Sequence, residues 1–328
     1  MLNKEDANKI FETDAEQVAY QAVAAIDEIR VGHEFFDGAI SGIEECIKAS
    51  AYAREPINCM LLGEGGMGKT SVARQIVQSM KPEVIKENDM ETKTVPAFYT
   101  SFRSATSLDA LTADMLKKLG DGKPESGKPE DKATRVLELL IHCKTKIIFI
   151  DELHDLDGFE KRNYAAMQKL LKWVKAITNG GGPITCLMGI ESCHDLFEHD
   201  PEMARRFKRK FFLRRLMPGT KEQPGLLPGF LEDVYAEVME STPLTSFPAM
   251  TDHSVLQVWA ATGGSLDFIM TLVKEAALLV MRANRTNIEI GDFAEVWDSG
   301  VLDDSSVFKF NPFLAAPSLL YTAIREKR

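Results

Sequence analysis

Gly63-Glu64-Gly65-Gly66-Met67-Gly68-Lys69-Thr70 frames four free positions with two glycines and continues with Lys and Thr. Glycine lets successive backbone N–H groups turn toward one point, and this pattern is typical of a loop that holds nucleotide phosphates. The apolar run Ile57 to Leu62 precedes the loop, and the helical pattern Ser71 to Val77 follows it. Because the order is strand, loop and helix, the helix N-terminus directs its free N–H groups at the phosphates. The sequence therefore predicts a nucleotide-binding site.

Three kinds of contact are expected in this loop. The backbone holds phosphate oxygens, the Lys69 ammonium reaches the β- and γ-phosphates, and the Thr70 hydroxyl binds Mg²⁺. The residues expected to bind the nucleotide are Gly63, Gly65, Gly66, Met67, Gly68, Lys69, Thr70 and Ser71. ATP and Mg²⁺ are the predicted cofactors.

A second motif follows later in the chain, where the apolar run Ile147 to Ile150 ends in Asp151 and Glu152. Such a run is typical of a central parallel strand, because helices cover both of its faces. A carboxylate at the C-terminal end of that strand emerges beside the phosphate loop. We expect Asp151 to hold the Mg²⁺ shell and Glu152 to orient and deprotonate the attacking water. The two motifs together predict an ATPase.

Composition sets limits on the rest of the molecule. The chain has 328 residues, of which 45% are hydrophobic and 27% are charged. This length suffices for an ATPase core and one smaller domain. The net charge of −10 excludes a uniformly basic coat for nucleic acid but is compatible with a local basic surface.

Neither a signal peptide nor a membrane span is visible in the sequence. The N-terminus carries early acidic residues, and no apolar run approaches the length that crosses a bilayer. The cysteines are five in number and scattered, which suits reduced thiols. We therefore expect a cytoplasmic protein that does not bind a membrane.

Four regions follow from the patterns along the chain. Residues 1–55 have helical spacing and form the expected N-terminal helical segment, and residues 56–217 form the α/β core. After a linker rich in Pro and Gly, residues 218–298 show only helical patterns and predict an all-helical lid. Residues 299–328 form a tail in which Pro interrupts the apolar pattern.

Five apolar runs in the core are expected to be strands separated by helices. They are Ile57–Leu62, Pro96–Phe102, Ile147–Ile150, Ile184–Ile190 and Lys210–Leu216. This alternation predicts an α/β fold with a parallel five-stranded sheet. The stretch 120–131, in which Gly, Pro, Lys and Glu dominate, is expected to be a mobile surface loop.

An ATP-binding α/β core with a helical lid resembles the AAA+ ATPases, which are P-loop NTPases. The residue patterns of the motifs resemble those of the TnsC/TniB family of transposon regulator ATPases, over about residues 30–300. This resemblance rests on Leu61-Leu62-Gly63, on the stretch Ile148 to Leu156, and on Asp200-Pro201-Glu202-Met203-Ala204-Arg205-Arg206-Phe207. In the second block Asp155 replaces the Asn that is usual in the family.

The resemblance implies a catalytic arginine from a neighbouring subunit. In AAA+ rings the nucleotide lies between subunits, and this arginine finger stabilises charge on the transferred γ-phosphoryl group. Matching the family's wording assigns the finger to Arg206, with Arg205 as the alternative. The simpler interpretation is a solvated basic face, because residues 205–215 hold seven Lys or Arg.

Other family positions are matched less closely. A polar residue that ends the fourth strand senses the γ-phosphate in the family; the candidates here are Glu191 and Ser192, and we favour Glu191. In loosely similar initiator ATPases, a segment worded like Val31-Gly32-His33-Glu34 lies against adenine, which predicts adenine contacts from Val31, Gly32 and His33. The start of the lid's third helix lacks the family's sensing arginine. This departure suggests slow hydrolysis or a switch that depends on the neighbour.

The family resemblance also implies a function. ATP binding would drive assembly of a homo-oligomeric ring or filament on duplex DNA, and hydrolysis would act as the switch for disassembly. The implied partners are a DDE-type transposase, a TniQ-type adaptor and an RNA-guided targeting complex. A ring lining needs only a few cations per subunit to contact DNA phosphates, and the candidates are Arg103, Lys117 and Lys118. Solvation alone also explains the two lysines.

Alternatives remain open at this point. Phe308, Phe310, Phe313 and Leu314 in the tail could dock on a transposase subunit. The tail could equally fold back on its own lid. The whole chain could be another AAA+ ATPase, such as a replication initiator or helicase loader, or less plausibly a P-loop kinase for a small molecule.

Overall fold

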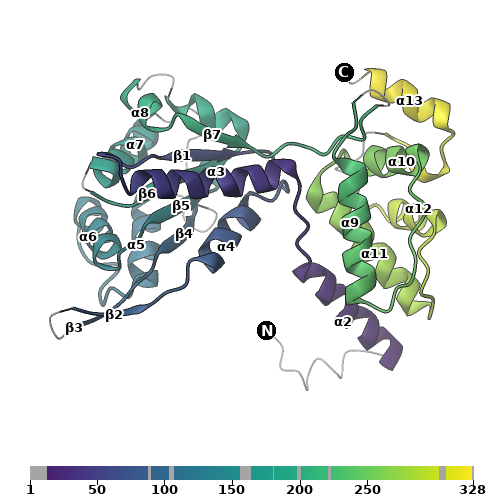
Figure 1. The fold of residues 1–328 in the computed structure, drawn as a ribbon, viewed down its shortest axis with the longest axis horizontal. Coiled ribbons are helices and arrows are strands. Elements are labelled where there is room, and N and C mark those ends of the chain that lie inside the picture. The colour runs from purple at the N-terminus through teal and green to yellow at the C-terminus, as the bar shows by residue number, and fades with distance from the viewer. Residues whose placement is uncertain are drawn as a thin grey trace. The chain divides into compact units, whose positions relative to one another are not determined.

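The computed structural model (Figure 1) describes residues 13–87, 90–102, 107–155, 164–179, 181–197, 201–220, 223–302 and 308–326. The described residues form two compact units. Phe35 to Arg214 make up the core unit, and the residues up to Glu34 together with those from Arg215 onward make up the lid unit. The chain therefore passes from one unit to the other twice. The N-terminal segment expected at residues 1–55 is divided at Glu34, so its second helix belongs to the core unit.

The core unit is built on a parallel five-stranded sheet, as predicted. Its strands are β1 (Cys59–Leu62), β4 (Ala97–Ser101), β5 (Ile147–Asp151), β6 (Ile184–Gly189) and β7 (Arg209–Phe212). Their order across the sheet is β4-β5-β6-β1-β7, and all neighbours pair in parallel. Every residue of β1, β5 and β6 is buried. The last strand is shorter than the run Lys210–Leu216, because the chain enters the lid unit at Arg215.

Helices cover both faces of this sheet (Figure 1). They are α3 (Glu34–Ser50), α4 (Lys69–Ser79), α5 (Leu108–Lys118), α6 (Pro129–His142), α7 (Tyr164–Asn179) and α8 (Pro201–Arg206), with 3-10 turns η2 (Leu153–Asp155) and η3 (Glu191–Phe197). On β1, Cys59 and Leu61 pack with α3 and α4, whereas Met60 and Leu62 pack with α5, α6 and α7. Alternate strand residues thus feed two apolar layers, which explains the continuous apolar runs.

A small hairpin was not expected from the sequence. Strands β2 (Val84–Glu87) and β3 (Met90–Lys93) pair antiparallel, and Figure 1 shows them projecting from the end of the core unit. Lys86 Nζ lies 2.6 Å from Glu91 Oε1 across the pair. Because the hairpin is mostly polar and exposed, it carries no buried apolar pattern that a sequence reading could detect.

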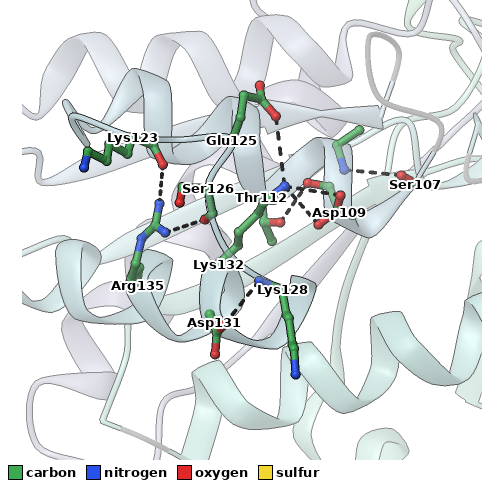
Figure 2. A network of polar contacts seen from close by, with 11 residues as sticks. Ser107, Asp109, Thr112, Lys123, Glu125, Ser126, Lys128, Asp131, Lys132 and Arg135 are labelled. Atoms are coloured by element: carbon green, nitrogen blue, oxygen red, sulfur yellow. Dashed lines mark hydrogen bonds and ion pairs between the residues drawn. The ribbon is translucent and has the colours of Figure 1, made fainter.

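The stretch 120–131, expected to be a mobile loop, is fastened by side chains of α6 (Figure 2). The Arg135 guanidinium donates to Asp121 Oδ2 at 3.0 Å, to the Ser126 carbonyl at 2.7 Å and to the Lys123 carbonyl at 2.9 Å. One planar fork can bind several acceptors at once, which composition alone does not reveal. The stretch is a surface connection with a defined path.

A second contact of this network ties α5 to α6. Lys132 is only 5% exposed, and its Nζ lies 3.2 Å from Asp109 Oδ1 and 4.0 Å from Glu125 Oε2. Asp109 stands in the first turn of α5, where Ser107 caps the helix by accepting from the Ala110 N–H. The buried ammonium therefore has carboxylate partners and fixes the start of α5 against α6 (Figure 2).

The lid unit is helical, as predicted, and includes the first described helix. It contains α2 (Asp14–Glu28), α9 (Leu227–Ser241), α10 (Asp252–Thr262), α11 (Leu266–Arg282), α12 (Ile290–Asp298), η5 (Pro312–Leu314) and α13 (Pro317–Glu326). Ala19, Ala22 and Ile26 of α2 share one apolar cluster with α11. Glu16 also pairs with Arg282 at 3.2 Å. Helix α2 is thus a structural member of the lid unit.

The tail folds back on the lid unit, which was one of the two alternatives. The buried Gln257 amide of α10 donates to the carbonyls of Pro312 and Phe313 at 3.2 and 2.9 Å. Phe313 is 4% exposed, and Phe308 joins Leu320 in a small apolar cluster. Phe310 and Leu314 remain exposed at 44% and 74%.

Two further features bear on the early expectations. Among the described residues, no helix is long and apolar enough to cross a bilayer. All five cysteines are buried with free thiols.

Candidate nucleotide-binding site

The phosphate loop joins β1 to α4, and its glycines are required by its geometry. A Cβ on Gly63 would lie 2.6 Å from the Leu213 carbonyl oxygen, so no other residue fits there. Gly66 and Gly68 have φ angles of 71° and 85°, in the left-handed region that favours glycine. The Gly63 N–H donates to the Gly189 carbonyl at 3.1 Å and fixes the loop to the end of β6. The loop conformation thus depends on glycine at these positions and on this backbone contact with β6.

Lys69 begins α4 and folds back into the loop. Its Nζ donates to the carbonyls of Gly63 and Glu64, both at 2.9 Å, and the residue is 6% exposed. Within the described part of the chain, no carboxylate lies at ion-pair distance from this ammonium. A buried cation whose partners are carbonyl dipoles is under-compensated. It is suited to bind the phosphate oxygens of a nucleotide.

Asp151, at the end of β5, is fully buried and accepts three hydrogen bonds. Its Oδ2 accepts from Thr70 Oγ1 at 2.8 Å and from Tyr99 OH at 2.7 Å, and its Oδ1 accepts from the Glu152 N–H at 2.8 Å. The two residues predicted to hold Mg²⁺ are therefore already in contact. A hydroxyl and a carboxylate are hard oxygen donors of the kind that Mg²⁺ prefers, so the residues fit this ion.

Tyr99 was missed by the sequence analysis. It lies on β4 opposite Phe149 of β5, and its hydroxyl reaches Asp151 two residues further on. Burial, and after it the hydrogen bond with Asp151, raises the pKa of Tyr99 above its usual range, so the phenol stays protonated and donates. A tyrosine inside an apolar strand requires a polar partner, and this was the signal available in the sequence.

Glu152 has a backbone conformation that is unusual for its residue type. Its φ is 56°, a left-handed value that costs about 1 kcal/mol or more for a residue other than glycine. Its Oε2 lies 3.2 Å from His154 Nε2, and the side chain is 23% exposed. The carboxylate predicted to act on water is thus oriented by its backbone and by His154. The sequence analysis assigned no role to His154.

Two residues of the η3 turn lie beyond β6, at the same edge of the sheet as the loop. Glu191 is exposed, and its sensing role stays a prediction. Cys193 is buried, and burial raises the pKa of its thiol to about 12, while the nearby charge of Lys69 opposes this shift and that of Glu152 adds to it. The pKa of Cys193 is therefore sensitive to both charges of the site.

Arg206 lies at the opposite edge of the sheet from its own phosphate loop. In the register of β1 and β7, Cys59 pairs with Arg209 and Leu62 pairs with Phe212. Arg206 precedes the first pair, whereas the loop follows the second. A strand rises about 3.3 Å per residue, so the two edges are separated by about 10 Å before any loop is counted. This placement suits an arginine that acts on a neighbouring subunit.

In the isolated chain Arg206 contacts residues of its own subunit. Its Nη2 donates to Glu202 Oε1 at 3.2 Å and its Nη1 to Thr178 Oγ1 at 3.3 Å. Arg205 is exposed. A hollow of about 500 Å³ is lined by Glu55, Pro56, Ile57, Asn58, Glu202, Arg205, Arg206, Lys208 and Arg209. Cations outnumber carboxylates in this lining, so the hollow suits an anion.

Three further predicted residues, Val31, Gly32 and His33, belong to the lid unit. His33 is 8% exposed and packs edge-on against Phe230 within the lid unit, with ring centroids 5.9 Å apart. Val31 packs beside the lid cluster, and Gly32 lies between these two residues. The adenine contacts of all three stay predictions.

The structure describes two of the three residues predicted to contact DNA. Arg103 lies outside the described residues. Lys117 and Lys118 are exposed in the last turn of α5, and Lys118 Nζ pairs with Asp114 at 2.6 Å. Lys117 is the less compensated of the two lysines.

Comparison with solved structures gives the fold. Cdc6p of Pyrobaculum aerophilum matches with a TM-score of 0.61 and 13% identity, over 93% of this chain and 89% of that protein. ORC2 of Aeropyrum pernix, solved as ADPNP-ADP complexes, matches with a TM-score of 0.59 and 13% identity over 84% and 71%. ORC1 of Aeropyrum pernix, solved with DNA, matches with a TM-score of 0.55 and 15% identity over 82% and 66%. The expected AAA+ fold is confirmed.

Comparison of sequences gives the family. No match is found among curated proteins. The protein-family model described as bacterial TniB protein matches residues 25–216, which is more than half of the chain and includes the phosphate loop, Asp151 and Arg206. The chain belongs to the bacterial TniB family.

Proposed function

We propose that this protein is an ATP-dependent, DNA-binding AAA+ regulator of DNA transposition, which assembles as a ring or filament on duplex DNA. The observation that carries the proposal is the division of the site. The Thr70–Asp151 pair and Lys69 form one part at one edge of the sheet, and the cationic hollow around Arg206 lies at the other. Two copies stacked edge to edge complete one site, so ATP binding and assembly become a single event.

Each residue then has a defined task. Lys69 and the loop backbone bind the phosphates, while Thr70 and Asp151 hold Mg²⁺, which neutralises charge on the β- and γ-phosphates. Glu152 accepts a proton from the attacking water and is kept in position by His154. Arg206 of the adjacent copy stabilises the charge that develops on the γ-phosphoryl group. Val31, Gly32 and His33 contact adenine, and Glu191 senses the γ-phosphate through water or a cation.

DNA binding by an acidic chain is accounted for by repetition. Lys117, Lys118 and Arg103 supply a few cations per subunit, and a ring presents them many times to DNA phosphates. The ORC1 structure with DNA supports a DNA role for this fold. The partners are a transposase, a TniQ-type adaptor and an RNA-guided targeting complex in the cytoplasm, and hydrolysis releases the assembly.

Electron microscopy of the full chain with duplex DNA tests the proposal. With a non-hydrolysable ATP analogue we expect rings or filaments, and without nucleotide we expect none. Glu152→Gln should bind ATP and trap assemblies, whereas Lys69→Ala should prevent them. Lys117→Met is a control that leaves the nucleotide site intact and weakens DNA contact only in part. A chain that stays monomeric under every condition overturns the proposal.

A replication initiator or helicase loader is the second candidate, because the similar solved structures are Cdc6 and ORC proteins. Initiators often add a winged-helix module after the lid. Beyond Arg215, the described residues contain helices and isolated bridges but no β-hairpin of that kind. A strand-transfer assay with a cognate transposase separates the two candidates, since only the regulator stimulates transposition.

A further inference from the structure

We propose that Glu202 is a positioning residue that holds Arg206 within its own subunit until the nucleotide of a neighbouring copy takes the guanidinium from it. This inference rests on the proposed action of Arg206 across the subunit interface. It adds a control on that action, because the finger is available only where a competing anion is present.

The contacts around Glu202 form a short chain of exchangeable partners. Glu202 Oε1 accepts from Arg206 Nη2 at 3.2 Å, and Glu202 Oε2 lies 3.0 Å from Lys175 Nζ on α7. Arg206 Nη1 donates to Thr178 Oγ1 at 3.3 Å, and Thr178 in turn donates to the Lys175 carbonyl at 3.1 Å. One carboxylate is therefore shared by two cations, and both other partners come from the same helix.

This hold on Arg206 is incomplete. Contacts of 3.2 and 3.3 Å are longer than the 2.7–2.9 Å typical of charge-assisted hydrogen bonds. The Nε atom is buried and has no hydrogen-bond partner among the described residues, and Glu55 lies only within 3.9 Å of Nη1. The Arg206 side chain is 14% exposed, so its charge is only partly solvated. A phosphate with more charge and more acceptor oxygens than a carboxylate can therefore displace Glu202.

Lys175 makes the exchange reversible. Its hydrogen bond and charge, followed by those of Arg206, lower the pKa of Glu202, so the carboxylate stays ionised. When Arg206 leaves, Lys175 still neutralises Glu202, and no bare carboxylate remains beside the incoming phosphate. Arg205, Lys208 and Arg209 line the same hollow and favour the approach of an anion. The arrangement predicts opposite effects for removing Glu202 and Lys175.

We call the retention of Arg206 by Glu202 the latch. The ATPase activity of the full chain on duplex DNA, measured against protein concentration, tests it. Glu202→Gln removes the competing charge, so half-maximal activity should occur at about two- to fivefold lower protein concentration. Lys175→Met removes the other cation that binds Glu202, so Glu202 holds Arg206 more strongly. The protein concentration of half-maximal activity, here called the midpoint, should therefore rise by a similar factor. The maximal rate should stay near that of the parent chain in both variants. Glu138→Gln, which changes an exposed carboxylate of α6 outside the hollow, should leave the protein concentration of half-maximal activity unchanged.

The possible outcomes are distinct. If Glu202 only stabilises α8, its substitution lowers the melting temperature and raises the midpoint, and both variants shift in the same direction; either result overturns the latch. Arg206→Ala tests the underlying function separately, because it should abolish the concentration-dependent activity. If Arg206→Ala keeps that activity, the finger assignment fails. If Arg206→Ala loses activity but neither Glu202→Gln nor Lys175→Met moves the midpoint, the latch alone is wrong.

Discussion

Lys69 and Lys132 are both buried lysines of the core unit, but their surroundings differ in one respect. Lys69 is 6% exposed and faces the carbonyls of Gly63 and Glu64. Lys132 is 5% exposed and faces the carboxylates of Asp109 and Glu125 (Figure 2). The charge of a buried cation is neutralised by carboxylate partners, whereas the charge of a buried cation that faces only dipoles is not. The difference separates a structural lysine from a binding lysine within one domain.

The contrast has an energetic meaning. Removing a cation that faces dipoles leaves no uncompensated charge behind, and it relieves the cost of burying that cation. Removing a cation that faces carboxylates leaves those carboxylates without their partner, although water compensates part of this loss because the Asp109 and Glu125 side chains are 46% and 84% exposed. Substitution of Lys69 should therefore affect function more than stability. Substitution of Lys132 should do the reverse.

Replacement of Lys69 by Ala should give the largest effect. We expect ATP hydrolysis to fall by about a hundredfold or more, because the contact with the β- and γ-phosphates is lost. The unfolding midpoint of the nucleotide-free protein in urea should stay the same or rise. A colorimetric phosphate assay and a urea titration measure the two quantities. A variant that unfolds more easily and still hydrolyses ATP would invalidate the comparison.

Replacement of Lys132 by Ala should give the complementary result. We expect a loss of about 1–3 kcal/mol in the free energy of unfolding, because Asp109 and Glu125 lose their shared partner. In the folded protein, the dissociation constant for a fluorescent ATP analogue should not change. Lys132→Met is the matched variant, since it keeps the apolar stem and removes only the charge. Nucleotide affinity that falls with stability at Lys132 would contradict a purely structural role.

Much of the core unit could be predicted because its signals are local. The apolar run from Ile147 to Ile150 is typical of a strand covered on both faces, and the glycines of the phosphate loop meet steric demands that the structure shows directly. The β2–β3 hairpin could not be found, since its residues are polar and exposed. Helix α2 has an apolar stripe, but nothing in that stripe says which unit it packs against.

Site residues that belong to a sequence motif could be predicted. Site residues whose role depends on strand register or backbone conformation were missed. Tyr99 reaches Asp151 only because β4 pairs with β5 so that Ser101 lies opposite Asp151. His154 reaches Glu152 because the backbone of Glu152 takes a left-handed turn. The sequence alone does not distinguish the buried Lys132 from an exposed lysine such as Lys117. In each of these cases the role of the residue depends on which side chains lie beside it in the folded chain, and residue type alone does not show this.

The smallest expected effect uses Cys193 as a reporter of the charge on Lys69. The pKa of this thiol is raised to about 12 chiefly by burial, and the positive charge of Lys69 lowers it. Because the thiolate reacts and the Cys193 side chain is 0% exposed, alkylation by iodoacetamide should be slow at pH 8 and should accelerate as the pH rises toward that pKa. Lys69→Ala removes the lowering charge, so the thiol pKa rises further and alkylation at pH 9 should slow by about two- to threefold. Peptide mass spectrometry measures the rate, and Lys117→Ala is the control that should not change it. An unchanged or faster rate in Lys69→Ala would mean that the ammonium does not lie uncompensated in the loop, which would remove the basis for treating the two buried lysines differently.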